Sequence, residues 1–172
     1  MNLPNKLTVL RVLLVPVFVV LYLDSMYTPA LVVFLVASFT DYLDGYIARK
    51  YDLTTNFGKI MDPLADKVLV VSAFCCMVEN GVMPAWMLIV ILTREFTVSG
   101  MRTVAASEGV VIAAGASGKI KTVLQMIAVP LLIIGGSGIL AIAAQGFLIA
   151  SVVMTVISGA EYIYKNRHIF TL

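Results

Sequence analysis

The chain has 172 residues, of which 60% are hydrophobic and 13% charged, and its mean hydropathy is +1.00. A water-soluble domain of this length would need more charge to cover its surface, so the composition favours an integral membrane protein with one domain over residues 1–172. The net charge of +2 is small, and we expect no nucleic-acid partner.

Six segments, taken in chain order, are long and apolar enough to cross a bilayer core, which is about 30 Å thick and needs about 20 helical residues. The stretch NLPNKLTV before the first of them contains Pro4 and alternates polar with apolar residues, which predicts a short N-terminal interfacial segment. The breaks between segments are polar or glycine-rich, as in KYDLTTNFG and GGSG. The expected fold is an all-α bundle of six transmembrane helices, at residues 8–24, 29–49, 60–79, 84–106, 118–136 and 138–164.

The basic residues predict the orientation of this bundle. Those near the predicted membrane boundaries lie on the side shared by the N-terminus, the second and fourth loops and the C-terminus, whereas the opposite side has only Asp24 and Glu79. Because Lys and Arg accumulate on the cytoplasmic side, we expect a multi-pass protein of the cell membrane with both termini in the cytoplasm. The loop between the second and third segments would lie on the same side.

Four aspartates lie in or beside these apolar segments, where an ionised carboxylate is costly. Asp41 and Asp44 end the second segment and are about 60° apart on a helix, while Asp62 and Asp66 begin the third and are about 40° apart. Each helix therefore presents two carboxylates on one face, and the polar loop between the helices lets the two faces meet.

Small residues accompany the aspartates. Gly45 and Ala48 lie in the same sector as the first pair, and Gly58 comes just before the second. With little or no side chain, they leave room for a ligand against the helix backbone. Close helix packing is the alternative explanation for such residues taken alone.

Converging carboxylates repel one another unless cations compensate them. Hard oxygen ligands in this number suit one or two Mg²⁺ or Mn²⁺ ions, which also bind substrate phosphates. Two alternatives stay open at this point: solvated helix ends, and a divalent-cation transporter. A transporter would usually place its acids near the bilayer midplane with access from both sides, whereas these acids crowd one side.

The spacing of these residues resembles the signature of the CDP-alcohol phosphatidyltransferase family. It reads Asp41-x2-Asp44-Gly45-x2-Ala48-Arg49-x8-Gly58-x3-Asp62-x3-Asp66 and matches at all eight positions. Three further stretches are similar to the bacterial branch that uses glycerol 3-phosphate as acceptor: NLPNKLTVLRV, TREF and GKIKT.

The resemblance implies an enzyme that moves a phosphatidyl group from CDP-diacylglycerol to an alcohol and releases CMP. It implies two metal ions, one held by Asp41, Asp44 and Asp62 and the other by Asp41, Asp62 and Asp66. Asp66 would also be the general base. Asp44 would take part in binding the donor, Gly45, Ala48 and Gly58 would leave space for its cytidine and ribose, and Arg49 would contact phosphate. A homodimer in a lipid membrane is implied as well.

An acceptor such as glycerol 3-phosphate carries its own phosphate and needs basic residues away from the metals. We expect Arg94, Lys119 and Lys121, with Arg102 available at the end of the fourth segment. Arg94 is the strongest candidate because an arginine within a span is costly unless it faces a partner or a wet cavity. The alternatives are an ion pair between Arg94 and Glu95 or another acid, and ordinary positive-inside placement of the two lysines. Another acceptor, inositol phosphate or serine, also fits the family.

Overall fold

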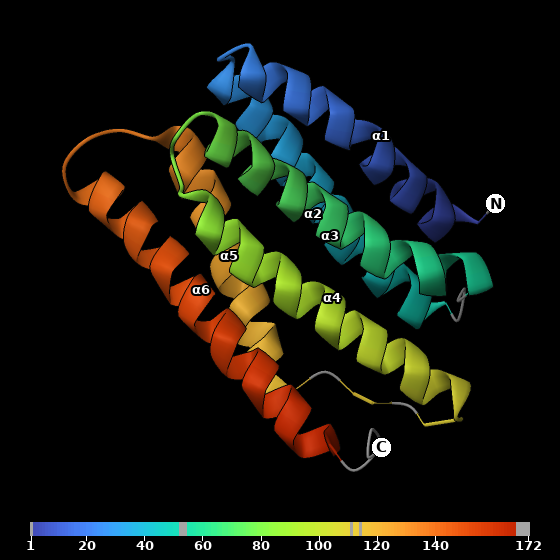
Figure 1. The fold of residues 1–172 in the computed structure, drawn as a ribbon. Helices are drawn as coiled ribbons and strands as arrows, with labels where there is room; N and C mark the ends of the chain where they lie inside the picture. The colour runs from blue at the N-terminus through green and yellow to red at the C-terminus, as the bar shows by residue number, and fades with distance from the viewer. Residues whose placement is uncertain (1, 52–54, 111, 114, 168–172) are drawn as a thin grey trace. The chain divides into compact units, whose positions relative to one another are not determined.

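The computed structural model describes residues 2–51, 55–110, 112–113 and 115–167 (Figure 1). These residues form six α-helices and contain no β-strand, so the predicted all-α fold is confirmed. The helices are α1 (Leu3–Leu23), α2 (Tyr27–Lys50), α3 (Asn56–Glu79), α4 (Ala85–Ser107), α5 (Ala116–Ile134) and α6 (Ile139–Asn166).

Four of the helices, α1, α2, α5 and α6, are long and apolar enough to cross a membrane. The other two, α3 and α4, are as long, with 24 and 23 residues, but charged side chains interrupt their apolar runs. Asp62, Asp66 and Lys67 lie in α3, and Arg94 and Glu95 lie in α4. The protein is therefore a multi-pass membrane protein, and most of the candidate site residues lie on α2, α3 and α4.

The first helix begins earlier than the sequence predicted. Residues 3–9, expected as a separate interfacial segment, are the first turns of α1. The Asn2 side chain accepts a hydrogen bond from the Asn5 N–H at 3.2 Å and caps the helix. Pro4 fits because a proline in the first turn lacks an N–H that would have no helical partner there. The polar residues of this stretch thus belong to the same helix as the apolar span.

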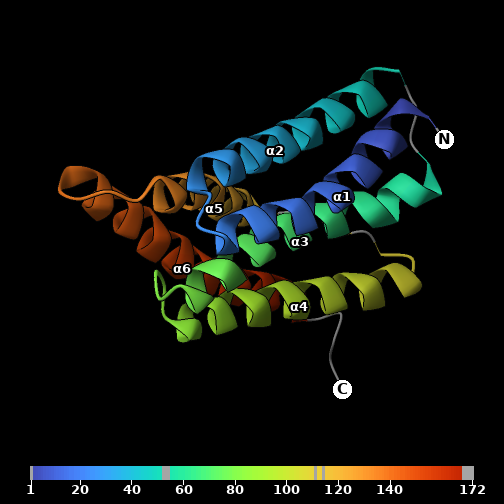
Figure 2. The ribbon, with the colours of Figure 1, turned by 90° about the horizontal axis from the view of Figure 1, so that it is seen from above.

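The chain divides into two compact units, residues 1–82 with 132–135 and residues 83–131 with 136–172. In the first unit, α1 packs against both α2 and α3 and lies between them (Figure 2). The Phe18 ring on α1 and the Phe34 ring on α2 are 5.9 Å apart and fully buried. Ala30 and Ala37, which are also fully buried, keep the α2 side of this core small. The polar ends of the three helices are held together by this apolar packing.

In the second unit, α4 packs along α6. Ile91 and Val98 are buried on α4, and Leu148 and Val152 are buried on α6. Polar side chains of α5 contact these two helices: Lys121 donates to Glu95 on α4, and Ser117 donates to Glu161 on α6. Lys121 and Glu95 belong to the second cluster described below.

Candidate active site

Two of the predicted aspartates share one buried arginine. Arg11 on α1 is fully buried, and its Nη1 lies 2.7 Å from Asp41 Oδ1 while its Nη2 donates to Asp44 Oδ2 at 2.5 Å. The Asp44 side chain is 3% exposed and that of Asp41 39%. The structure confirms that the two carboxylates lie on the same face of α2. It also shows that this face meets α1.

The third aspartate meets the same side of α1. The Thr8 hydroxyl donates to Asp62 Oδ1 at 2.6 Å and lies 3.1 Å from the carbonyl oxygen of Pro4. A hydroxyl has one proton, so the shorter contact marks the carboxylate as the main acceptor. Carboxylates from α2 and α3 are thus brought together against α1.

Gly58 lies beside this group. A Cβ atom built on Gly58 would lie 3.3 Å from Asp62 Oδ2 and 3.4 Å from Asn5 Oδ1, which is closer than most Cβ contacts. Thr55 accepts a hydrogen bond from the Gly58 N–H at 3.0 Å and donates to Asn5 Oδ1 at 2.9 Å. Thr55 therefore caps α3 and ties its start to α1. The absent side chain of Gly58 lets the Asp62 carboxylate and the Asn5 amide pack against the backbone of α3.

The structure gives the helix position of the other predicted donor-site residues but not the contacts that the sequence predicts for them. Asp66 is one turn beyond Asp62 on α3 and partly buried, and Gly45 follows Asp44 on α2. Ala48 and Arg49 lie in the last turn of α2, but their side chains are outside the described part of the structure. Their predicted contacts with the donor stay predictions.

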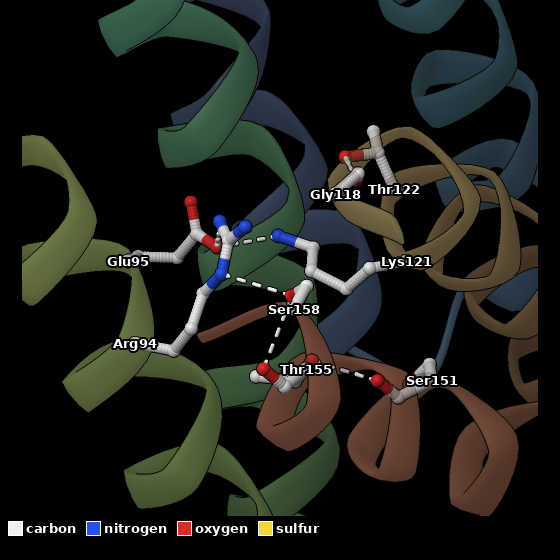
Figure 3. Close-up of polar contacts among 8 residues, drawn as sticks. All are labelled: Arg94, Glu95, Gly118, Lys121, Thr122, Ser151, Thr155 and Ser158. Carbon is white, nitrogen blue, oxygen red and sulfur yellow. Dashed lines mark hydrogen bonds and ion pairs between the residues drawn. The ribbon is translucent and has the colours of Figure 1, made fainter. Parts of the chain in front are cut away.

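A second cluster of charge lies in the unit of α4, α5 and α6 (Figure 3). The Glu95 Oε1 atom accepts from Lys121 Nζ at 2.5 Å and from Arg94 Nη1 at 3.0 Å, and Arg94 Nε donates to Ser158 Oγ at 3.2 Å. Lys121 and Glu95 are buried. The ion pair between Arg94 and Glu95, raised above as an alternative, is present, and it also brings Lys121 beside Arg94.

Two glycines border this cluster. A Cβ atom on Gly118 of α5 would lie 3.1 Å from Arg94 Nη2, and one on Gly159 of α6 would lie 3.1 Å from Arg94 Cγ. Both positions are too close for a side chain unless Arg94 moves. The other two predicted acceptor residues, Lys119 and Arg102, are not buried with this cluster. Lys119 is exposed, and the exposed Arg102 lies over the Tyr162 ring at 5.5 Å.

A family profile described as CDP-alcohol phosphatidyltransferase matches residues 1–157, which include the four aspartates and the cluster of Arg94, Glu95 and Lys121. The chain belongs to the CDP-alcohol phosphatidyltransferase family. It is 43% identical to the CDP-diacylglycerol--glycerol-3-phosphate 3-phosphatidyltransferase of Bacillus subtilis (strain 168), over 96% of this chain and 95% of that protein. Proteins with the same name in Rickettsia typhi and Haemophilus influenzae are 40% and 38% identical. Each of these two matches covers 94% of this chain, and 94% and 91% of the relative.

The metal site expected for a CDP-alcohol phosphatidyltransferase can be compared with this geometry. Among the described side chains, no three from His, Cys, Asp and Glu are arranged so that they could hold a metal ion. Arg11 contacts one carboxylate oxygen of Asp41 and one of Asp44, and Thr8 donates to one oxygen of Asp62. The residues nevertheless fit a hard divalent cation, because carboxylate oxygens are its preferred ligands and two of these carboxylates already surround a positive group.

Sequence reasoning about this CDP-alcohol phosphatidyltransferase missed the side chains that hold the predicted residues. Asn5, Thr8 and Arg11 are spaced three residues apart, which is a helical signal, but the polar stretch around Asn5 and Thr8 predicts an interfacial segment and Arg11 by itself predicts only positive-inside charge. Gly118 and Gly159 carry no local signal of their own, because their role depends on where Arg94 packs.

Proposed function

We propose that the protein transfers the phosphatidyl group of CDP-diacylglycerol to sn-glycerol 3-phosphate, giving phosphatidylglycerophosphate and CMP in anionic phospholipid synthesis. The observation that carries the proposal is the convergence of Asp41, Asp44 and Asp62, from two helices, on one side of α1. The names of the relatives support the donor and the acceptor.

On the donor side, Asp41, Asp44, Asp62 and Asp66 would hold two Mg²⁺ or Mn²⁺ ions. Bound there, the ions would neutralise charge on the pyrophosphate and on the CMP leaving group. Gly58 on α3, with Gly45, Ala48 and Arg49 on α2, would line the nucleotide site. Asp66 would accept the proton of the acceptor hydroxyl.

On the acceptor side, Arg94 and Lys121 are the residues that the geometry favours. Their pairing with Glu95 leaves the three side chains with one net positive charge, which suits an anionic phosphate. The absence of a side chain at Gly118 lets Arg94 Nη2 approach the backbone of α5. Lys119 and Arg102 are exposed and would attract the acceptor before it reaches Arg94 and Lys121.

We also infer that both termini and the aspartate site face the cytoplasm and that the protein works as a homodimer. The orientation is supported by the distribution of Lys and Arg, and the dimer by the resemblance to the family. The orientation is tested by introducing a cysteine at either terminus of the protein and labelling intact cells with a reagent that does not cross the membrane. The homodimer is tested by measuring the mass of the detergent-solubilised protein.

The reaction is tested by incubating purified protein with labelled CDP-diacylglycerol and a set of acceptors. We expect CMP release with glycerol 3-phosphate well above that with serine or inositol phosphate, loss of release in excess EDTA and its return with Mg²⁺ or Mn²⁺. Full activity in EDTA would contradict the metal proposal. Movement of divalent ions across sealed vesicles without CMP release would favour the transporter.

The acceptor site is tested separately with Arg94→Ala. Loss of one charge-assisted hydrogen bond is worth about 1.5–3 kcal/mol, so the KM for glycerol 3-phosphate should rise roughly ten- to a hundredfold. The KM for CDP-diacylglycerol should change little. Lys165→Ala is the matched control, since Lys165 is exposed and pairs with Glu161 on its own helix. An unchanged acceptor KM in an active Arg94→Ala protein would exclude this site.

A further inference from the structure

The first turns of α1 have no part in the reaction as described so far. Asn5, Thr8 and Arg11 recur every three residues, so they follow one side of the helix. All three are buried, with exposed fractions of 8%, 0% and 0%. Buried polar groups are costly in an otherwise apolar span unless they are paired. Their partners therefore indicate what this side of α1 does.

Each of these side chains is paired with the aspartate site or with the cap of α3. Asn5 accepts from Thr55, Thr8 donates to Asp62, and Arg11 binds Asp41 and Asp44. Among the described residues, these two carboxylates are the only polar partners of the Arg11 guanidinium, and its Nε lacks a hydrogen-bond acceptor. The polar side of α1 is thus directed at the carboxylates of both other helices in its unit.

We propose that α1 is the third wall of the donor site and that Thr8 and Arg11 are positioning residues, which orient the aspartates for divalent cations. The inference rests on the proposed metal-dependent function. Thr8 holds Asp62 by Oδ1, and Oδ2 lies beside Gly58, where an added Cβ atom would come within 3.3 Å of it. The two-pronged guanidinium of Arg11 holds Asp41 and Asp44 at the same time and offsets part of their repulsion.

Thr8→Val is the sharpest variant, because valine keeps the shape of threonine and removes only the hydroxyl. Hydrogen bonds that orient metal ligands typically change metal affinity by about 10–100-fold. We expect Thr8→Val to weaken Mn²⁺ binding by about tenfold, measured from the free Mn²⁺ signal in electron paramagnetic resonance on detergent-solubilised protein. Thr8→Ser should restore most of the affinity, because it returns the hydroxyl.

Thr155→Val is the matched control. Thr155 is fully buried on α6, and its hydroxyl donates to the carbonyl oxygen of Ser151 one turn earlier, as that of Thr8 approaches Pro4. Thr155→Val therefore loses the same kind of contact with a helix carbonyl as Thr8→Val, but it loses no contact with a carboxylate. Its Mn²⁺ affinity should equal that of the wild type, even where its thermal stability falls.

Arg11→Lys provides an independent variant. Lysine keeps the charge but offers a single point of contact, so it cannot hold both carboxylates in the same geometry. We expect weaker Mn²⁺ binding here too, at unchanged net charge.

The outcomes separate this inference from the function on which it rests. A wild-type protein that binds no Mn²⁺ would overturn both. A wild-type protein that binds Mn²⁺, with folded Thr8→Val and Arg11→Lys variants of equal affinity, would overturn the positioning role alone. In that case α1 would serve only to stabilise the helices.

Discussion

Glu95 is a single carboxylate that pairs with two cations in the unit of α4, α5 and α6. Lys121 and Arg94 both contact its Oε1 atom. The exposed fraction of the side chain is 5% for Lys121, 14% for Arg94 and 10% for Glu95. Removing one partner of a buried ion pair leaves an uncompensated charge, which is more costly than losing the attraction itself. The stability of this unit should therefore depend strongly on Glu95.

Glu95→Gln keeps the size of the side chain and removes its charge. We expect the free energy of unfolding to fall by about 3–5 kcal/mol, measured by thermal or denaturant unfolding in detergent. Glycerol 3-phosphate should recover part of the loss, since its phosphate would replace the missing negative charge.

Lys165→Gln is the comparison for this prediction. Lys165 pairs with Glu161 at 2.5 Å, but its side chain is 67% exposed, and an exposed pair contributes about 0–1 kcal/mol. Equal losses for the two variants would show that the Glu95 cluster is well solvated, contrary to the burial described above.

At the scale of helices, Gly159 lets α6 come close to the Arg94 side chain of α4. Because a Cβ atom there would lie 3.1 Å from Arg94 Cγ, near the start of the side chain, Arg94 cannot avoid it by moving only its far end. Gly159→Ala should therefore displace the guanidinium and raise the KM for glycerol 3-phosphate several-fold. The helix itself should gain stability, since alanine is favoured over glycine in helices by about 1 kcal/mol.

Gly146→Ala on the same helix is the control, because nothing lies within 4 Å of its added Cβ atom. It should leave the acceptor KM unchanged. Steady-state kinetics with varied glycerol 3-phosphate distinguishes the two, and equal KM values for both variants would contradict the close contact.

The helices themselves could be predicted from the sequence, whereas their partners could not. The segment expected at 84–106 is α4, Ala85–Ser107, because Pro84 and the apolar run are local signals. The shared face of Asp41 and Asp44 also followed from helical spacing. The contact of Arg11 with that face depends on how α1 packs against α2, and such long-range packing leaves no local pattern.

At the scale of the whole molecule, the two units carry opposite chemistry. The unit that contains α1, α2 and α3 presents carboxylates, and the unit that contains α4, α6 and most of α5 presents Arg94, Glu95 and Lys121, whose three charges sum to one positive charge. This division matches a reaction with two substrates, one bound through cations and one through its own anionic phosphate. In the proposed reaction, each unit would therefore recognise a different substrate.

The continuity of α1 makes the catalytic machinery sensitive to hydrophobic mismatch. A helix of 21 residues is about 31 Å long, close to the thickness of a bilayer core. Thicker or thinner bilayers are accommodated by tilting such a helix, and here any tilt also moves Thr8 and Arg11 relative to α2 and α3. In vesicles of increasing acyl-chain length, CMP release should pass through a maximum, and a flat profile would contradict the coupling. The thickness of the surrounding bilayer would then regulate turnover through the tilt of α1.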